Sequence, residues 1–145
     1  MMLKNVHRIR IEWGDCDPAG IVFYPRYFEW FDRCTHHLFE AATGDVKKDM
    51  LEKHGGAGLA LLEARAEFKA ASHYGEDLAI ESEVVEFRRS SFLVEHRVTK
   101  AGEPMLKGYE TRLWTVRDPE NAGRLRSAPM PADIIAAFQK ETPPR

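Results

Sequence analysis

Two carboxylates and a thiol stand together near the start of the chain, at Asp15, Cys16 and Asp17. Residues 14–20 also contain Pro18 and two glycines, which favour turns, so we expect this segment to form a loop. Asp17 precedes Pro18, and a residue before proline is biased toward an extended backbone that helps to fix its side chain. An ionised carboxylate aimed in this way can attack a carbonyl carbon or activate a water molecule. The alternative is a structural aspartate that stabilises a turn or a helix start.

Cys16 is not expected to act as the nucleophile. No histidine stands near it in the sequence, and the flanking carboxylates should raise the pKa of its thiol and so disfavour the thiolate. Cys34 is the only other cysteine, which is too few for a disulfide framework and gives no metal-type spacing.

A metal site is the other reading that reactive side chains suggest, at His36, His37 and Glu40. His36 and Glu40 would share one face of a helix. Adjacent histidines on a helix point in different directions, however, and the HExxH pattern is missing from the sequence. We therefore expect no metal.

The elements that must position the loop can be read from hydrophobic spacing. Residues 8–13 alternate between charged and apolar side chains, which predicts a first strand. After Pro25, apolar residues recur every three or four positions to about Thr43, which predicts a long helix ended by Gly44. Because apolar positions extend nearly all round this helix, we expect it to be buried on every side.

The rest of the chain predicts mainly strands, separated by clear turn signals. This order of elements is typical of an α+β fold, with the long helix packed on one face of an antiparallel sheet. The expected elements are a short helix at 45–54, strands at 59–69, 77–88, 92–100 and 104–117, and a terminal helix at 132–140.

Length and composition limit the class of protein. With 145 residues and 43% hydrophobic content, the chain suits a single domain covering residues 1–145. A net charge of -2 gives no overall attraction to nucleic acid or to an anionic membrane. The sequence has neither an apolar signal core nor a stretch of membrane-spanning length, so we expect a cytoplasmic location.

Residues 15–27 closely resemble the signature of the 4-hydroxybenzoyl-CoA thioesterase family. The similarity continues through Trp30 and Asp32, the segment 88–92 and the proline-rich end. The resemblance implies a hotdog fold, in which an antiparallel sheet of five to six strands wraps around a long central helix. It also implies the hydrolysis of an acyl-CoA thioester.

By this resemblance, Asp17 is the catalytic carboxylate and the Tyr24 backbone amide is the oxyanion donor. Elementary helix physics agrees, because the first N–H groups of a helix lack internal partners and carry the positive end of the helix dipole. Free amide groups near Phe23 and Tyr24 would therefore stabilise the oxygen of a thioester under attack.

The resemblance further matches Asp32 with the residue that receives the ring hydroxyl of a hydroxybenzoyl group. The alternative is a carboxylate on the helix surface near Arg33 and His36. The sequence alone leaves both readings open.

For coenzyme A, the resemblance points to Arg88, Arg89, Ser90 and Ser91, where two guanidinium groups could bind the phosphates. This chain has Ser90 where the family has a further basic residue, and a solvated turn is the alternative. Arg124 and Arg126 are weaker candidates.

The resemblance thus implies an enzyme that hydrolyses 4-hydroxybenzoyl-CoA or a related aryl-CoA and that forms a homodimer or homotetramer. No cofactor is expected, since coenzyme A is part of the substrate. A general short-chain acyl-CoA thioesterase is one alternative, although such enzymes usually carry a histidine where this chain has Pro25. A non-catalytic acyl-CoA-binding protein would have no use for Asp17, and the residue pair of hotdog hydratases is not found in the sequence.

Overall fold

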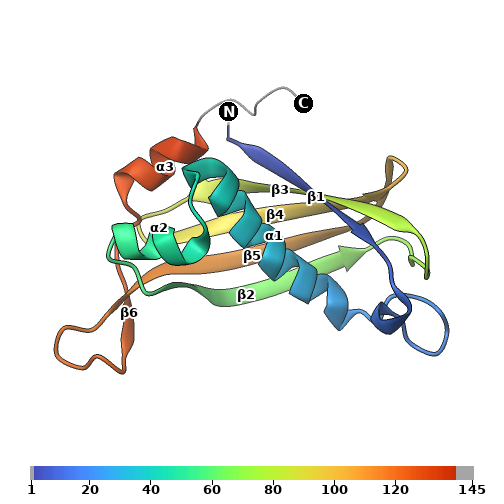
Figure 1. Ribbon diagram of the computed structural model, residues 1–145, viewed down its shortest axis with the longest axis horizontal. Helices are drawn as coiled ribbons and strands as arrows, with labels where there is room; N and C mark the ends of the chain where they lie inside the picture. The colour runs from blue at the N-terminus through green and yellow to red at the C-terminus, as the bar shows by residue number, and fades with distance from the viewer. Residues whose placement is uncertain (1, 140–145) are drawn as a thin grey trace.

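The computed structural model describes residues 2–139, which form one antiparallel sheet with helices packed against it (Figure 1). The strand order is β1-β3-β4-β5-β2, and a short β6 pairs with β5. The elements are β1 (Lys4–Arg10), α1 (Pro25–Thr43), α2 (Lys47–Lys53), β2 (Gly58–Phe68), β3 (Asp77–Phe87), β4 (Ser91–Lys100), β5 (Glu103–Arg117), β6 (Leu125–Ser127) and α3 (Ala132–Phe138).

The long helix α1 runs diagonally across the sheet (Figure 1). It begins at Pro25, whose missing N–H is harmless in the first turn, and ends before Gly44, which has a φ of 79°. The structure confirms both predicted ends of the long helix. The expected burial on every side is wrong for the described residues, because Glu29, Asp32 and Glu40 lie on an exposed face. These polar positions make α1 amphipathic, so only one stripe of the helix faces the core.

The remaining differences from the expected elements are local. The first strand runs over Lys4–Arg10, and Trp13 belongs to a 3-10 turn over Trp13–Asp15, where its side chain is 65% exposed. The strand β6 was not predicted, because three exposed residues carry no alternating pattern. The predicted end of the last helix at residue 140 lies outside the described residues. None of the helices in residues 2–139 is long and apolar enough to cross a membrane.

The centre of the core depends on a glycine. Phe31 from α1 stacks on the His96 ring from β4, with 4.7 Å between ring centroids and 7° between planes. The neighbouring strand β5 places Gly108 directly beneath Phe31, where an added Cβ would overlap the aromatic ring. Helix and sheet can therefore approach closely only because residue 108 has no side chain.

Replacing Gly108 with alanine is expected to lower the free energy of unfolding by about 1–3 kcal/mol, the usual penalty for overpacking a tight core. Thermal unfolding of the purified variant measures this effect. Gly123→Ala is the matched control, because an added Cβ there meets only the Asn121 side chain at 3.5 Å. An equal melting temperature for Gly108→Ala and wild type would contradict the proposed packing role.

Candidate active site

The loop between β1 and α1 is held in one shape by its backbone. Asp15 closes it at both ends, because its carboxylate accepts the Glu12 N–H at 2.9 Å and its carbonyl accepts the Phe23 N–H at 2.9 Å. The Val22 N–H donates to the Ser72 carbonyl at 2.9 Å, which ties the loop to the segment before β3. The loop is thus fixed on two sides, and the hydrogen bonds of Asp15 hold its two ends together.

Asp17 lies at the tip of this loop with one carboxylate oxygen engaged. Its Oδ1 accepts the Ala19 N–H at 2.8 Å, and its carbonyl accepts the N–H of Gly20, whose φ is 80°. Oδ2 accepts no hydrogen bond from the described residues, and the side chain is half-buried. One oxygen therefore fixes the carboxylate in a turn while the other remains open for chemistry.

The start of α1 has a single unused amide in the part of the chain that the structure describes. Pro25 has no N–H, and the Arg26 and Tyr27 amides donate to the carbonyls of residues 23 and 24 at 2.9 and 3.1 Å. The Phe23 amide is bound to Asp15, so the expectation of a free amide at Phe23 is wrong. The Tyr24 N–H has no acceptor within residues 2–139. It is left to bind an anionic oxygen at the positive end of the helix.

A cavity of about 290 Å³ opens beside this amide. Its walls are mainly apolar and include Val22, Tyr24, Tyr27 and Phe68. Burial raises the pKa of the Tyr27 hydroxyl, so this group stays protonated. Phe23 precedes Tyr24 but does not close the site, because it is 48% exposed. The described residues thus enclose only part of the site.

Cys16 and the helix histidines have separate surroundings in the structure. Burial, followed by the charges of Asp15 and Asp17, raises the pKa of the Cys16 thiol, which disfavours a thiolate. The two histidines diverge: His36 Nδ1 lies 3.7 Å from Asp32, whereas the His37 ring packs against His7. Within residues 2–139, no group of three or more metal-ligating side chains converges.

Asp32 does not stand as a free surface carboxylate. Its Oδ1 accepts a hydrogen bond of 2.7 Å from Nη2 of Arg112, a residue of β5 that is 4% exposed. The same Nη2 donates to Glu110 at 2.6 Å, and Nη1 donates to the Leu59 carbonyl at 3.0 Å. His36 is a neighbour of Asp32, as the surface reading expects, but Arg112 is the main partner.

Behind Arg112, a buried polar chain crosses the sheet. Glu110 bonds to His96 Nε2 at 2.9 Å and to the Thr35 hydroxyl, and His96 Nδ1 bonds to the Ser82 hydroxyl at 2.6 Å. Despite burial, the hydrogen bonds from His96 and Arg112 hold the pKa of Glu110 at about 2. Sequence reasoning missed this chain, although His96 and Glu110 occupy positions that strand alternation assigns to the dry face.

The residues expected to bind coenzyme A lie at the other end of the molecule. Arg88 follows β3, whereas the loop that carries Asp17 is hydrogen-bonded to the segment before β3 (Figure 1). The 11 residues of β3 span roughly 33 Å at ~3.3 Å per residue. Arg88 is exposed and pairs with Glu86 at 3.1 Å, and the Ser90 carbonyl accepts the Trp114 N–H. A single chain therefore does not bring Arg88–Ser91 to Asp17.

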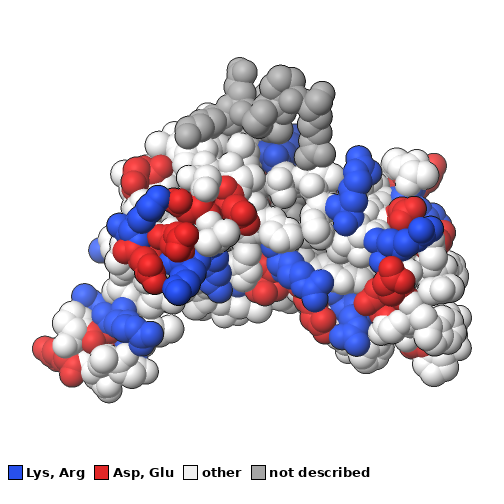
Figure 2. Space-filling model, viewed as in Figure 1, with Lys and Arg blue, Asp and Glu red and all other residues white. Residues whose placement is uncertain are grey.

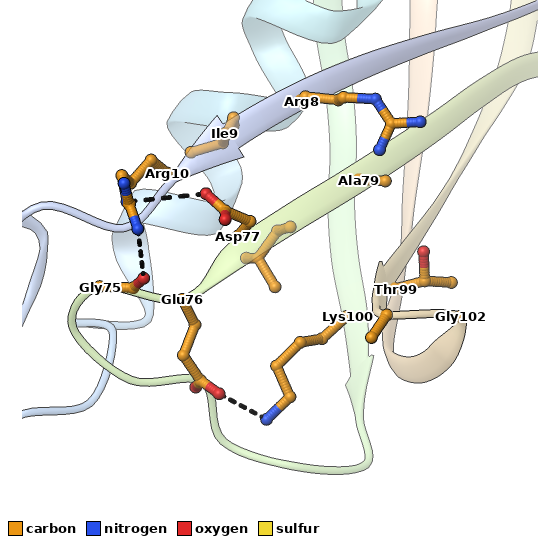
Figure 3. A pocket seen from close by; sticks show the side chains of 12 residues that line it. Arg8, Ile9, Arg10, Gly75, Glu76, Asp77, Ala79, Thr99, Lys100 and Gly102 are labelled. Atoms are coloured by element: carbon orange, nitrogen blue, oxygen red, sulfur yellow. Dashed lines mark hydrogen bonds and ion pairs between the residues drawn. The ribbon is translucent and has the colours of Figure 1, made fainter.

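A surface hollow of about 920 Å³ lies between β1, the start of β3 and the turn from β4 to β5 (Figure 3). Its charged groups pair with each other: Arg10 lies 3.7 Å from Asp77, and Lys100 lies 2.7 Å from Glu76. Of its three cations, Arg8 alone has no partner within residues 2–139. We therefore assign no site to this hollow.

Comparison with known proteins identifies the family of this chain. The family model described as the thioesterase-like superfamily matches residues 11–138. The 4-hydroxybenzoyl-CoA thioesterase of Pseudomonas sp. (strain CBS-3) is 35% identical over 131 residues, which cover 87% of this chain and 91% of that protein.

Solved structures agree with this assignment. A 4-hydroxybenzoyl CoA thioesterase, crystallised as an aspartate-to-asparagine mutant with 4-hydroxybenzoyl CoA, matches with a TM-score of 0.83 at 32% identity, covering 93% of this chain and 98% of that one. A gentisyl-coenzyme A thioesterase matches with a TM-score of 0.77 at 29% identity, covering 94% and 100%. These matches confirm the hotdog fold. The chain belongs to the thioesterase-like superfamily, which confirms the family resemblance, and it is a thioesterase.

Proposed function

We propose that this protein hydrolyses an aryl-CoA thioester, 4-hydroxybenzoyl-CoA or a close relative, to the free acid and coenzyme A. The observation that carries the proposal is the presence of two unused groups in residues 17–24. Asp17 keeps Oδ2 open on a rigid loop, and Tyr24 offers the unused amide at the start of α1. The names of the relatives support the substrate class, since two of them act on hydroxylated aryl-CoA esters.

In the proposed reaction, the Tyr24 N–H binds the thioester oxygen as negative charge develops there. Asp17 Oδ2 attacks the carbonyl carbon, the C–S bond breaks, and coenzyme A leaves as a thiolate that takes a proton from water. Water then hydrolyses the mixed anhydride and restores the carboxylate. The geometry is equally consistent with Asp17 acting as a general base, in which case it takes a proton from the attacking water and passes it to the leaving thiolate.

A thiol-release assay tests this proposal directly. Wild-type protein is mixed with 4-hydroxybenzoyl-, benzoyl-, phenylacetyl- and short aliphatic CoA thioesters, and the free thiol is measured. We expect the highest kcat/KM with an aryl thioester. Release from none of these substrates would overturn the proposed function, and a clear preference for aliphatic chains would overturn the aryl assignment alone.

A short-chain acyl-CoA thioesterase is the second candidate, and one observation favours it. Asp32 is already paired with Arg112 and half-exposed. Asp32 therefore keeps a partner even when the substrate has no ring hydroxyl. The free-energy penalty for binding other acyl groups is then smaller than it would be for an unpaired carboxylate. The same thiol-release panel separates the two candidates.

The proposed site needs a second copy of the chain, because Arg88–Ser91 and Asp17 lie at opposite ends of the sheet. The edge strand β2 supports such an assembly, since Leu61, Leu62 and Phe68 are more than half exposed along it. Figure 2 shows the surface hollowed between the β5–β6 hairpin and the loop region before α1. A twofold axis at this edge would bring opposite ends of two chains together. We propose a homodimer at least, with a homotetramer built from such dimers.

A reducing, cytoplasmic location also belongs to the proposal. It is supported by Cys16 and Cys34, which are both free thiols in the structure.

Replacing Arg88 and Arg89 with alanine is expected to raise KM for CoA thioesters about tenfold or more and to change kcat far less. The reason is that phosphate contacts bind the ground state and the transition state alike. Steady-state kinetics with the best substrate measure both constants. An unchanged KM would show that the nucleotide binds elsewhere.

Mixing the Asp17→Asn variant with the Arg88→Ala/Arg89→Ala variant tests whether these arginines act across the dimer. A hybrid dimer contains one Asp17→Asn chain and one Arg88→Ala/Arg89→Ala chain. If the arginines act across the dimer, one of its two sites has Asp17 from one chain and both arginines from the other. Random exchange should then restore wild-type KM in about one quarter of all sites, since half of the dimers are hybrids. Hybrids that show no wild-type KM would place the arginines and Asp17 of each site in the same chain.

A further inference from the structure

We infer that Arg112 is a positioning residue for acyl-group specificity, which holds the Asp32 carboxylate in the orientation that receives the ring hydroxyl of an aryl substrate. This inference rests on the proposed function and adds to it a residue of the protein core. Arg112 touches no substrate, because it is 4% exposed, and it acts through Asp32.

The geometry leaves Arg112 little freedom. Its two Nη groups make three hydrogen bonds, to Asp32, to Glu110 and to the Leu59 carbonyl, at 2.6–3.0 Å. The two N–H groups of Nη2 are divided between the two carboxylates, one to each. Asp32 is thereby held by a planar fork that is itself fixed in the sheet, which a lysine ammonium could not reproduce.

Without Arg112, the Asp32 carboxylate would have no hydrogen bond from a side chain within residues 2–139. Its side chain is 52% exposed and lies on the outer face of α1, where an aspartate normally samples several rotamers. The bond to Arg112 uses Oδ1 on the core side, and Oδ2 has only His36 Nδ1 at 3.7 Å, beyond hydrogen-bond distance. The carboxylate therefore presents one oxygen with a fixed direction to whatever lies against this face.

Burying the polar residues behind Arg112 costs desolvation free energy. Glu110, His96, Thr35 and Ser82 are each no more than 2% exposed, and apolar residues of similar volume usually stabilise a core as well or better. Among the members of this chain within residues 2–139, Asp32 alone reaches the surface. Buried polar groups that end at one exposed carboxylate hold that carboxylate in a single orientation.

Arg112→Lys tests the inference because lysine keeps the positive charge beside Glu110 and removes the fork. The measurement is the ratio of kcat/KM for 4-hydroxybenzoyl-CoA to that for benzoyl-CoA. We expect Arg112→Lys to lower this ratio about threefold to tenfold, toward the value of Asp32→Ala, and to change kcat for benzoyl-CoA by less than about twofold. In the Asp32→Ala background, Arg112→Lys should not change the ratio further.

Arg97→Lys is the matched control. Arg97 also pairs with carboxylates on the sheet, Glu81, Glu83 and Glu95, but within residues 2–139 it has no ion pair with α1. Its replacement should therefore leave the ratio unchanged. If Arg112→Lys does not fold, the double variant Glu110→Gln/Arg112→Met takes its place. It removes both buried charges together, and the glutamine amide remains as a hydrogen-bond partner for His96 and Thr35. The same fall in the ratio is expected from this double variant.

The possible failures are distinct. A folded Arg112 variant with the wild-type ratio, or a wild type that hydrolyses both esters equally, would overturn the role of Arg112 and leave the thioesterase function intact. A wild type that hydrolyses no CoA thioester would overturn the proposed function itself.

Discussion

Replacing Asp17 with asparagine is expected to lower kcat by about 10²-fold to 10⁴-fold, the usual size for losing a general base, or by more if Asp17 is the nucleophile. Asparagine keeps an oxygen in the place of Oδ1, so the hydrogen bond from the Ala19 N–H and the turn should survive. What is lost is the negative charge at the open oxygen. Steady-state kinetics measure kcat, and calorimetric titration with the best substrate should show that binding is retained.

Asp118→Asn is a matched control for this change. Asp118 accepts the Glu120 N–H at 2.9 Å, two residues ahead, which is the same turn geometry that Asp17 forms with Ala19 at 2.8 Å. If the role of Asp17 were only to stabilise its turn, the two variants would behave alike. Turnover by Asp17→Asn within about threefold of wild type, a small factor against that expected range, would contradict the catalytic assignment.

The sequence predicted best those elements whose ends carry their own signals. The boundaries of α1 follow from Pro25 and Gly44, because one lacks the N–H that a helix interior needs and the other adopts a left-handed backbone. The long strands follow from alternation and from turn residues between them. β6 could not be found in this way, since it exists only because it pairs with the end of β5.

The candidate site was predictable in part. Local sequence placed Asp17 on a loop and unused amides at the start of α1, because both features depend on neighbouring residues. It could not show that the loop folds back and uses the Phe23 amide, which leaves Tyr24 as the donor. Nor could it show that Arg112, 80 positions away along the chain, bonds to Asp32. Long-range contacts across a sheet are set by strand order, which single-sequence patterns do not specify.

The distance between Asp17 and Arg88 shows the same limit at a larger scale. Both residues belong to segments that resemble the same family. The Asp17 loop, however, lies near the start of β3, and Arg88 follows the end of β3. The sequence lists the parts of a proposed site without saying which copy of the chain supplies them. The fold shows how far apart these two segments lie, and from this distance we propose a site shared between two copies.

Replacing Tyr24 with proline is expected to lower kcat about 10²-fold to 10³-fold, the size observed for removing one oxyanion donor. Proline removes the backbone N–H, which is the group proposed to bind the thioester oxygen. The substitution suits the structure, because Tyr24 has a φ of -53°, close to the value that proline fixes, and its N–H makes no hydrogen bond within residues 2–139. The helix should therefore form as before, and thermal unfolding checks that it does.

Tyr24→Ala separates the amide from the side chain. It removes the phenol ring, which is 61% exposed and lines the cavity, but it keeps the N–H. If the amide is the donor, alanine should change kcat by less than about tenfold, far less than proline does. Equal losses in both variants would assign the effect to the ring. A folded Tyr24→Pro enzyme with wild-type kcat would remove the oxyanion role from this amide, and the developing charge would then have to be stabilised by a group from the second copy of the chain.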